Sequence, residues 1–164
     1  MASPDSVIIS PLQPSYLDVA YQLHCQNHIA PWNKNTFSEC NQKLYLTLQA
    51  LNSEGFVGYC ILHQVCDELT IMDIAVARNS RRRGVGRKLL QHALEHAKLN
   101  NANSVWLEVR ASNQAALQLY QKAGFAIQQI RKQYYPTETG TEDGVVMSLN
   151  FPTLSSSEMD NFYE

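Results

Sequence analysis

The stretch from Ile71 to Leu90 constrains the fold of this chain more than any other segment. An apolar run at Ile71–Val76 is followed by a basic segment with two glycines at Arg81–Arg87, and then by a helical pattern. Glycines at a strand-to-helix junction leave out side chains where the first helical N–H groups lack partners, so an anion can contact the backbone directly. The arginines add attraction and bidentate donors. The stretch therefore predicts a loop that binds a ligand with a pyrophosphate group.

Other kinds of loop share part of this pattern. An ordinary solvated loop before a helix also combines glycine with basic residues, so the loop alone does not identify a ligand. A Walker loop needs a longer glycine spacing and a Lys-Ser/Thr pair at the helix start, and the dinucleotide-binding fingerprint needs three glycines. This stretch has neither, which disfavours both nucleotide-binding classes.

Length and charge limit the classes of function. The 164 residues suit one domain, predicted at residues 1–150, followed by a polar and flexible tail at 151–164. The net charge of −2 gives the whole molecule no electrostatic basis for binding nucleic acid or an anionic membrane. The sequence has neither a long apolar segment nor a secretion-signal pattern, so we expect a soluble, cytoplasmic protein and, in the simplest case, a monomer. The spacing of the four cysteines indicates reduced thiols rather than a metal or disulfide framework.

Hydrophobic periodicity and turn residues predict the order of the elements. Alternation predicts strands at residues 7–9, 44–49, 56–65, 68–76, 105–110, 125–134 and 144–150. Helical spacing predicts four helices, at residues 15–27, 33–42, 85–97 and 113–123, with Ser15, Asn33 and Asn113 as N-caps and Gly124 after the last helix. The segment 135–143 is expected to be a polar loop. Strand, helix and strand around the glycine loop imply one parallel pair, and the other neighbours are expected to be antiparallel.

Several motifs resemble known acetyltransferases. Arg81, Gly84 and Gly86 match the R-x-x-G-x-G signature of the GNAT acetyltransferase superfamily, and the predicted element order agrees with that fold. Over about residues 5–150 the chain resembles the bacterial RimI-type family, which acetylates the N-terminal alanine of small-subunit ribosomal protein eighteen. The matching segments are His28–Trp32 with Phe37, Trp106–Asn113, Tyr120, Gly124-Phe125, Tyr134–Pro136, Glu142-Asp143 and Met147.

The resemblance implies an α/β (α+β) GNAT fold with a mixed, mostly antiparallel sheet of about seven strands. A parallel pair at the cofactor cleft and four flanking helices complete this expectation. Acetyl-coenzyme A is the implied co-substrate, and no metal is expected. The implied pyrophosphate-binding residues are Arg81, Arg82, Arg83, Gly84, Val85, Gly86 and Arg87.

Two further contacts with the cofactor are implied. Backbone groups of Ile74, Ala75 and Val76 would meet the pantetheine amides and the thioester carbonyl. Their apolar side chains are equally explained by core packing. Asn113 would bond the cofactor in addition to capping its helix.

Glu108 and Tyr120 are the implied acid–base pair. Taken alone, the sequence pattern predicts that Glu108 is a solvent-facing strand residue and that Tyr120 is a core residue. An α-ammonium group with a pKa near 8 must lose its proton before it attacks a thioester. By resemblance Glu108 takes that proton, directly or through water, and Tyr120 gives one to the coenzyme A thiolate. Transfer would be direct, because no spacing indicates an activating partner for a cysteine nucleophile.

Aromatic residues in two loops are the candidate substrate contacts. Trp32, Tyr134 and Tyr135 place rigid amphipathic rings where an extended peptide end could be held between opposite walls. Trp32 could instead fill a gap between two helices. RimI-type proteins commonly have glutamate four residues before the position of His28, whereas this chain has His24, which changes an expected contact with the substrate amine.

Rival functions remain open from the sequence. A lysine or small-amine acetyltransferase would share the fold, and a non-catalytic acetyl-coenzyme A sensor would keep the glycine loop without the chemistry. The segment His92–His96 matches the H-x-x-E-H motif of inverted zinc peptidases. Its side chains flank the apolar face of the predicted helix and should point mostly to solvent, so no zinc site is expected.

Overall fold

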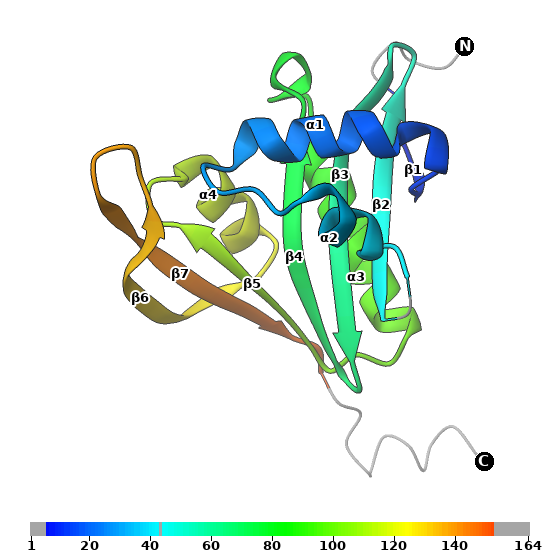
Figure 1. Ribbon diagram of the computed structural model, residues 1–164. Coiled ribbons are helices and arrows are strands. Elements are labelled where there is room, and N and C mark those ends of the chain that lie inside the picture. Colours follow the sequence, from blue (N-terminus) through cyan, green and yellow to red (C-terminus); the bar gives the residue numbers. More distant parts are fainter. Residues whose placement is uncertain (1–5, 43, 153–164) are drawn as a thin grey trace, which may run out of the picture.

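Seven strands form a single sheet in the computed structural model, which describes residues 6–42 and 44–152. The order across the sheet is β1-β2-β3-β4-β5-β7-β6 (Figure 1). The strands are β1 (Ile8–Pro11), β2 (Tyr45–Asn52), β3 (Gly55–Val65), β4 (Glu68–Val76), β5 (Ser104–Arg110), β6 (Ala126–Pro136) and β7 (Thr141–Asn150). β4 and β5 are parallel, and every other neighbouring pair is antiparallel. The predicted mixed sheet with one parallel pair is therefore confirmed.

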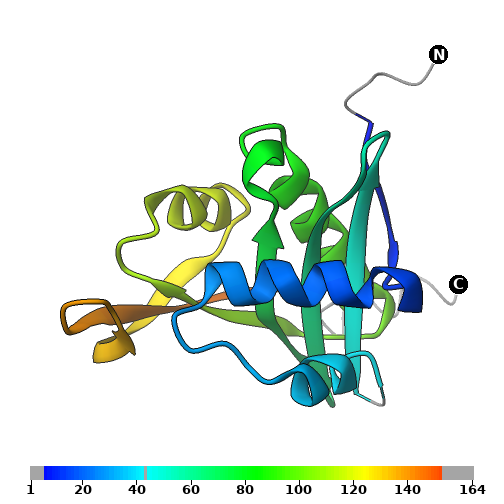
Figure 2. The ribbon, with the colours of Figure 1, turned by 45° about the horizontal axis from the view of Figure 1, so that its top comes forward.

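Helices cover both faces of this sheet. They are α1 (Leu17–Asn27), α2 (Lys34–Glu39), α3 (Val85–Leu99) and α4 (Gln114–Lys122), with short 3-10 turns η1 (Pro14–Tyr16) and η2 (Arg78–Ser80). α1 and α2 cross one face of β2, β3 and β4, and α3 and α4 lie on the opposite face (Figures 1 and 2). In the described part of the chain, no helix is long and apolar enough to cross a membrane.

Each helical layer has its own hydrophobic core. The α3 side buries the face that the periodicity predicted, with Val85, Leu89, Leu90, Ala93 and Ala97 fully covered. The α1 and α2 side holds a smaller core of Leu12, Ala20, Leu23, Phe37, Cys40, Tyr59, Ile61 and Ala75. A fully buried leucine contributes about 1.5–3 kcal/mol, so both layers hold the sheet in place.

β4 and β5 separate toward their carboxyl ends, as Figure 1 shows. Their ladder ends at the pair Ile71–Leu107, so among the described residues the segment 73–76 pairs with β3 alone. A β-bulge lies in β4, because Leu62 pairs with Ile71 while Ile61 pairs with Asp73. The extra residue reverses the alternation of side chains. Asp73 consequently faces α1 instead of the face occupied by Ile71.

Two helix boundaries differ from the sequence predictions. Ser15 is not an N-cap, because it lies inside η1, which Pro14 begins, and α1 starts without a side-chain cap. α2 ends at Glu39 rather than near residue 42. Asn33 does cap α2, since its side chain accepts a hydrogen bond of 2.9 Å from the N–H of Thr36, an interaction worth about 1 kcal/mol.

The polar loop predicted at 135–143 is present but shorter, because only residues 137–140 lie outside the strands. β6 continues to Pro136 and β7 begins at Thr141, because Tyr135 pairs with Glu142 across the hairpin. The strands accommodate an irregular register near Gln133, which has a positive φ of 53°. Asp143 accepts the Gln133 N–H at 3.0 Å and holds this irregularity.

The start of the predicted tail packs on the domain. Phe151 is half-buried against the α3-side core, and its N–H donates to the Asn103 carbonyl at 2.9 Å. The Lys98 ammonium lies 5.3 Å from the centre of the Phe151 ring. Residues 153–164, the rest of the predicted tail, lie outside the described part of the chain.

Candidate active site

The glycine loop ends at a helix N-terminus that has no side-chain cap. Gly84 is the N-cap of α3 and adopts a left-handed conformation with φ of 80°, which L-residues rarely adopt. Its carbonyl accepts the first helical bond from Lys88 at 3.1 Å. The N–H groups of the first helical turn therefore have no partner within the helix, and the helix dipole adds partial positive charge. This geometry fits a pyrophosphate group.

Gly86 lies where three elements meet. A Cβ placed on it would be 3.6 Å from Leu119 Cδ2 of α4 and 3.8 Å from Val76 Cγ2 of β4. These are ordinary contact distances, so the fold itself tolerates a small side chain here. The loop thus brings the start of α3 against the carboxyl end of β4 and against α4.

The arginines of the loop have different surroundings. Arg81 donates from Nε to the Val76 carbonyl and from Nη2 to Asn27 Oδ1, both at 3.1 Å. It therefore ties the loop to β4 and to the end of α1. Arg82, Arg83 and Arg87 are exposed and lie beside the helix N-terminus. These three side chains provide the local positive charge that the sequence predicted.

The other predicted cofactor contacts lie at the end of β4 and at the start of α4. Ile74, Ala75 and Val76 form the part of β4 that leaves β5, so one backbone edge of this segment has no neighbouring strand among the described residues. Asn113 caps α4 as expected, because its Oδ1 accepts the Ala116 N–H at 3.2 Å. The capping role of Asn113 is confirmed, and its contact with a cofactor stays a prediction.

Glu108 lies on the face of β5 that carries no helix. Val105, Leu107 and Val109 point into the α3-side core, and the alternation turns Glu108 the other way. Its Oε1 is 3.1 Å from Arg131 Nη2 of β6. A surface hollow of about 260 Å³ adjoins it, lined by Glu68, Thr70, Trp106, Leu107, Glu108, Gln129, Arg131 and Val146.

Tyr120 is buried on α4 with only 4% exposure. Its ring packs on Phe125 at a centroid distance of 5.8 Å. Burial raises the pKa of the Tyr120 phenol, and negative charge on neighbouring groups, Asp73 and Tyr135 among them, raises it further. The phenol is therefore fully protonated at neutral pH, as a proton donor must be.

Tyr134 and Tyr135 cover Gly144 of the adjacent strand. Their ring atoms would lie 3.0 and 3.1 Å from a Cβ at Gly144, so the glycine makes room for both rings. The Arg110 guanidinium lies 4.7 Å from the centre of the Tyr135 ring. Burial, the largest cause, raises the pKa of Tyr135 to about 12. Tyr134 is 46% exposed, so its ring is available to a ligand.

Arg110 and Glu142 hold this hairpin against β5. The Arg110 Nη1 donates to Glu142 Oε1 and to the Pro136 carbonyl, each at 2.9 Å. Glu142 Oε2 also accepts the Ser112 N–H at 3.3 Å. These hydrogen bonds, with Ser112 first and Arg110 next, lower the pKa of Glu142. The pair fixes the position of the two tyrosines relative to the start of α4.

Trp32 lies between α1 and α2, where the sequence predicted a turn. The main-chain N–H of Trp32 donates to His24 Nε2 at 3.1 Å, and its main-chain carbonyl accepts from the Tyr21 hydroxyl at 3.0 Å. The indole is half-buried against the smaller core, so part of it does fill a gap between helices. Figures 1 and 2 both place the α1–α2 connection on the side of the molecule nearest the β6–β7 hairpin.

The sequence profile described as the Acetyltransferase (GNAT) family matches residues 12–125. This chain belongs to the GNAT acetyltransferase family. The [ribosomal protein bS18]-alanine N-acetyltransferase of Escherichia coli K12 is 38% identical over 141 residues, which cover 86% of this chain and 95% of that protein. Membership of the family makes the chain an N-acetyltransferase by class, and the resemblance to RimI-type proteins is confirmed.

Solved structures agree with this assignment. The crystal structure of the Escherichia coli ribosomal-protein-S18-alanine N-acetyltransferase matches with a TM-score of 0.85 and 36% identity, covering 92% of this chain and 97% of that chain. Arabidopsis thaliana NAA60 in complex with acetyl-CoA matches with a TM-score of 0.80 at 17% identity, covering 88% and 98%. The second likeness shows a shared fold. The predicted GNAT fold is therefore confirmed.

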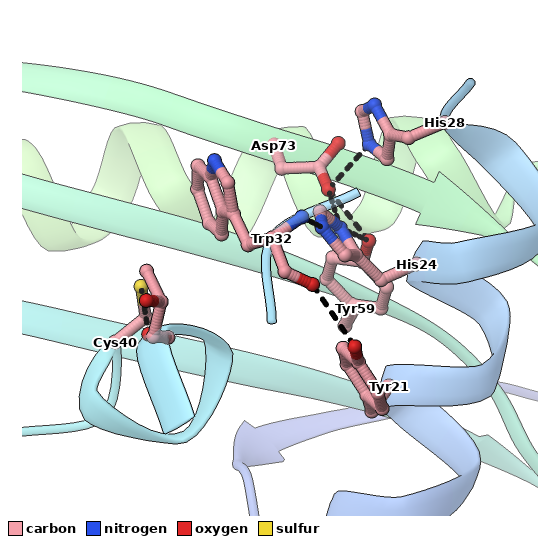
Figure 3. Close-up of polar contacts among 8 residues, drawn as sticks. Tyr21, His24, His28, Trp32, Cys40, Tyr59 and Asp73 are labelled. Carbon is pink, nitrogen blue, oxygen red and sulfur yellow. Dashed lines mark hydrogen bonds and ion pairs between the residues drawn. The ribbon is translucent and has the colours of Figure 1, made fainter. Parts of the chain in front are cut away.

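The GNAT sheet also holds a polar cluster that the sequence did not predict (Figure 3). The Asp73 Oδ2 lies 2.9 Å from His24 Nδ1, 3.0 Å from His28 Nε2 and 2.6 Å from the Tyr59 hydroxyl. His24 is 2% exposed, and Tyr59 is fully buried. One signal in the sequence could have pointed to the cluster: Asp73 lies within an apolar strand, where a buried carboxylate requires hydrogen-bond donors.

Hydrogen bonding fixes the charge of this cluster. Burial by itself would raise the pKa of Asp73, but hydrogen bonds from His24, His28 and Tyr59 outweigh it and lower that pKa strongly. The main-chain N–H of Trp32 can only donate, so His24 Nε2 must carry a lone pair to accept it. The ring proton of His24 is therefore on Nδ1. Asp73 is thus an anion that accepts the proton on His24 Nδ1, and Tyr59 keeps its proton because burial and Asp73 raise its pKa.

The zinc-peptidase motif does not assemble a site in this GNAT protein. His92 and Glu95 are exposed on α3. His92 Nδ1 donates a hydrogen bond to the Lys88 carbonyl at 3.1 Å. Within residues 6–42 and 44–152, the only group of metal-type side chains close enough to share an ion is His24, His28 and Asp73. The four cysteines are free thiols in the structure.

Proposed function

We propose that this protein transfers an acetyl group from acetyl-coenzyme A to the α-amine of the N-terminal alanine of ribosomal protein bS18, the small-subunit protein eighteen. The observation that carries the proposal is the 38% identity to the Escherichia coli enzyme of that name, which extends over 95% of its length. Such a protein works in the cytoplasm, where ribosomal proteins are made.

The cofactor is proposed to lie along β4 and the start of α3. Its pyrophosphate would contact the backbone at Gly84, Val85 and Gly86, with Arg82, Arg83 and Arg87 nearby and Arg81 bracing the loop. The uncapped helix start supports this placement. Ile74, Ala75 and Val76 would bind the pantetheine through their free backbone edge, and Asn113 would add one bond. Bound acetyl-coenzyme A supplies the activated acetyl group.

Glu108 and Tyr120 are proposed to move protons at the reacting atoms. Glu108 would take a proton from the attacking nitrogen, directly or through water, as it forms the new C–N bond. Tyr120 would protonate the departing thiolate, and its raised pKa supports a phenol that holds its proton until then. The four free thiols have no part in this direct transfer.

The acceptor peptide is proposed to enter between two aromatic segments. Trp32 and Tyr134, with Tyr135 behind, would form opposite walls that accept a small first side chain. Exposure of Tyr134 and the position of the α1–α2 connection support this arrangement. Two rigid rings hold an extended peptide end at low entropic cost.

A second candidate is acetylation of lysine side chains or of a small amine. His24, at a position that is commonly glutamate in RimI-type proteins, favours this alternative, because it is buried and bonds Asp73 instead of facing a substrate amine. Acceptor recognition at this position therefore differs from the expectation for the family.

A peptide panel tests the proposed function. Peptides that differ only in their first residue are incubated with the protein and acetyl-coenzyme A, and products are read by mass. We expect fastest acetylation of the alanine peptide and slow acetylation when the first side chain is bulky. Equal rates across the panel, or no product with any peptide, would contradict the proposal.

A further inference from the structure

We propose that His28, held by Asp73, is a second proton acceptor in the acetyl transfer and takes the first proton from the substrate α-ammonium. The inference rests on the proposed function, because it concerns the same reaction. An α-ammonium must lose two protons to become an amide nitrogen. The resemblance gives Glu108 the proton lost before attack; with His28 in that role, Glu108 instead takes the proton released as the C–N bond forms.

His28 is joined through Asp73 to the β4 segment proposed to hold the thioester. It follows the last residue of α1, and its Nε2 is 3.0 Å from Asp73 Oδ2. Asp73 directly precedes the Ile74–Val76 segment proposed for the thioester, and the bulge in β4 turns it to the α1 face. The cluster therefore adjoins the point where β4 leaves β5.

The imidazole has one bonded and one outward nitrogen. Nε2 donates to Asp73, so in the neutral ring the lone pair is on Nδ1, which is turned away from the carboxylate (Figure 3). The side chain is 35% exposed, whereas that of His24 is 2% exposed. We assign the substrate contact to Nδ1 of His28, because both ring nitrogens of His24 already have partners in Asp73 and Trp32.

Charged and titratable groups around His28 favour proton uptake. They are His24 on α1, Tyr59 on β3, Asp73 on β4 and Arg110 on β5. The hydrogen bond to Asp73 raises the pKa of His28, and partial burial and the Arg110 charge oppose this effect without reversing it. Tyr59 stays protonated, and the lone pair of His24 Nε2 is already used by the main-chain N–H of Trp32. His28 is therefore the histidine of the cluster that can exchange a proton with a substrate.

A metal ion is the rival occupant of this cluster. Two histidines and one carboxylate offer ligand atoms within 4.8 Å of one another. His24 Nε2, however, accepts the Trp32 N–H, so Nδ1 must keep its proton and has no lone pair for an ion. The donor set therefore fits a hydrogen-bonded carboxylate–imidazole pair and not a metal site.

The proton balance of the step is complete. The α-ammonium gives one proton to His28 Nδ1 and becomes a neutral amine. The lone pair of the amine nitrogen then attacks the thioester carbon as the C–N bond forms. The C–S bond breaks, Tyr120 protonates the thiolate, and Glu108 takes the second proton from nitrogen. That proton returns to Tyr120 through solvent, and His28 releases the first proton to water.

Single-turnover rates as a function of pH test the inference. Protein saturated with acetyl-coenzyme A is mixed with the alanine peptide, and His28→Gln is compared with His92→Gln, a matched change on the exposed face of α3. We expect His28→Gln to lose about 10²-fold in rate with unchanged coenzyme A binding, and His92→Gln to lose nothing. Melting temperatures verify that each variant is folded.

The pH at which the rate falls gives a signature that a structural role would not produce. His28 must be neutral to accept a proton, so the wild-type rate falls as the pH drops through the His28 pKa. Asp73→Asn removes the carboxylate that raises this pKa, so the fall moves to lower pH. In His28→Gln the fall in rate follows the pKa of the substrate α-amine, about 8, and no longer responds to Asp73→Asn.

The outcomes separate the two proposals. A wild-type protein that does not acetylate the free peptide would refute the proposed function. An active wild type with a rate loss below about threefold in His28→Gln, or with an unmoved pH dependence, would overturn the role of His28 alone. If Asp73→Asn does not fold, the rate and pH dependence of His28→Gln decide the question.

Discussion

The two halves of the candidate site are built in opposite ways. The cofactor loop uses consecutive residues, Arg81–Arg87, and the start of a single helix. The cluster on the acceptor side joins His24, Tyr59 and Asp73 across separations of 14 to 49 residues. A backbone-built site needs only local chain geometry, whereas a buried charge needs partners brought from elsewhere in the fold. The difference predicts that cofactor binding and acceptor chemistry can be altered separately.

The largest expected effect is on the acceptor side. Glu108→Gln and Tyr120→Phe should each lower turnover by about 10²- to 10⁴-fold, because each removes a proton-transfer group. Coenzyme A affinity, measured by calorimetry, should stay within about twofold because neither group belongs to the loop. Glu95→Gln on the exposed face of α3 is the matched control. Wild-type turnover in both variants would assign the chemistry to other residues.

The complementary change affects the cofactor loop. Gly86→Val should weaken coenzyme A binding by about 10- to 100-fold, or about 1.4–2.8 kcal/mol, because its side chain occupies the space of the phosphates. An added Cβ would lie 3.6 and 3.8 Å from its nearest atoms, so the alanine variant should keep the fold, and a melting temperature verifies that the valine variant is folded. Gly86→Ala should give a smaller loss in the same direction. Wild-type affinity in the valine variant would remove this loop from the site.

A smaller effect should distinguish the two substrates. Trp32→Ala and Tyr134→Ala should each raise the peptide KM by about 5- to 10-fold, the loss expected for an aromatic contact. The KM for acetyl-coenzyme A should change less. The Trp32 main chain keeps its bonds to His24 and Tyr21 in the variant, so the turn should stay in place. Equal changes in the KM for the peptide and the KM for acetyl-coenzyme A would argue that the two substrates do not bind to separate parts of the site.

The smallest expected effect is on stability. Asp73 raises the pKa of His28 in the folded protein above the unfolded value near 6.5. The stabilisation from this pair is therefore complete below that pH and is lost as the pH rises through the folded pKa. His28→Gln should lower Tm by about 1–2 °C more at pH 6 than at pH 8.5. A Tm difference that grows with pH would contradict the assigned pair.

The cofactor half could be predicted from sequence because its signals are local. The apolar strand, the two glycines and the amphipathic face of α3 each follow from short-range patterns, and the structure places them as expected. The parallel pair followed from the same segment. Asn33 and Asn113 were recognisable as caps because a cap depends on residues three positions away.

The resemblance named candidate residues on the acceptor side, but the Asp73 cluster and the register of the β6–β7 hairpin could not be predicted, because each depends on an irregularity in strand pairing. Simple alternation puts Asp73 on the face of Ile71, and only the bulge in β4 brings it to His24 and His28. A second irregularity lies near Gln133, and pairing resumes beyond it at Tyr135–Glu142 and Pro136–Thr141, inside the two ends of the segment expected to be a loop. Both depend on pairing between strands, which no periodicity along one strand can show.

One measurement tests the central claim most directly. A basic ribosomal-protein peptide that begins with alanine, and the same peptide with a blocked N-terminus, are each incubated with the protein and acetyl-coenzyme A and analysed by fragment mass. We predict one acetyl group on the α-amine of the free peptide and none on the blocked peptide. Acetylation of the blocked peptide on an internal lysine at a comparable rate would contradict the account.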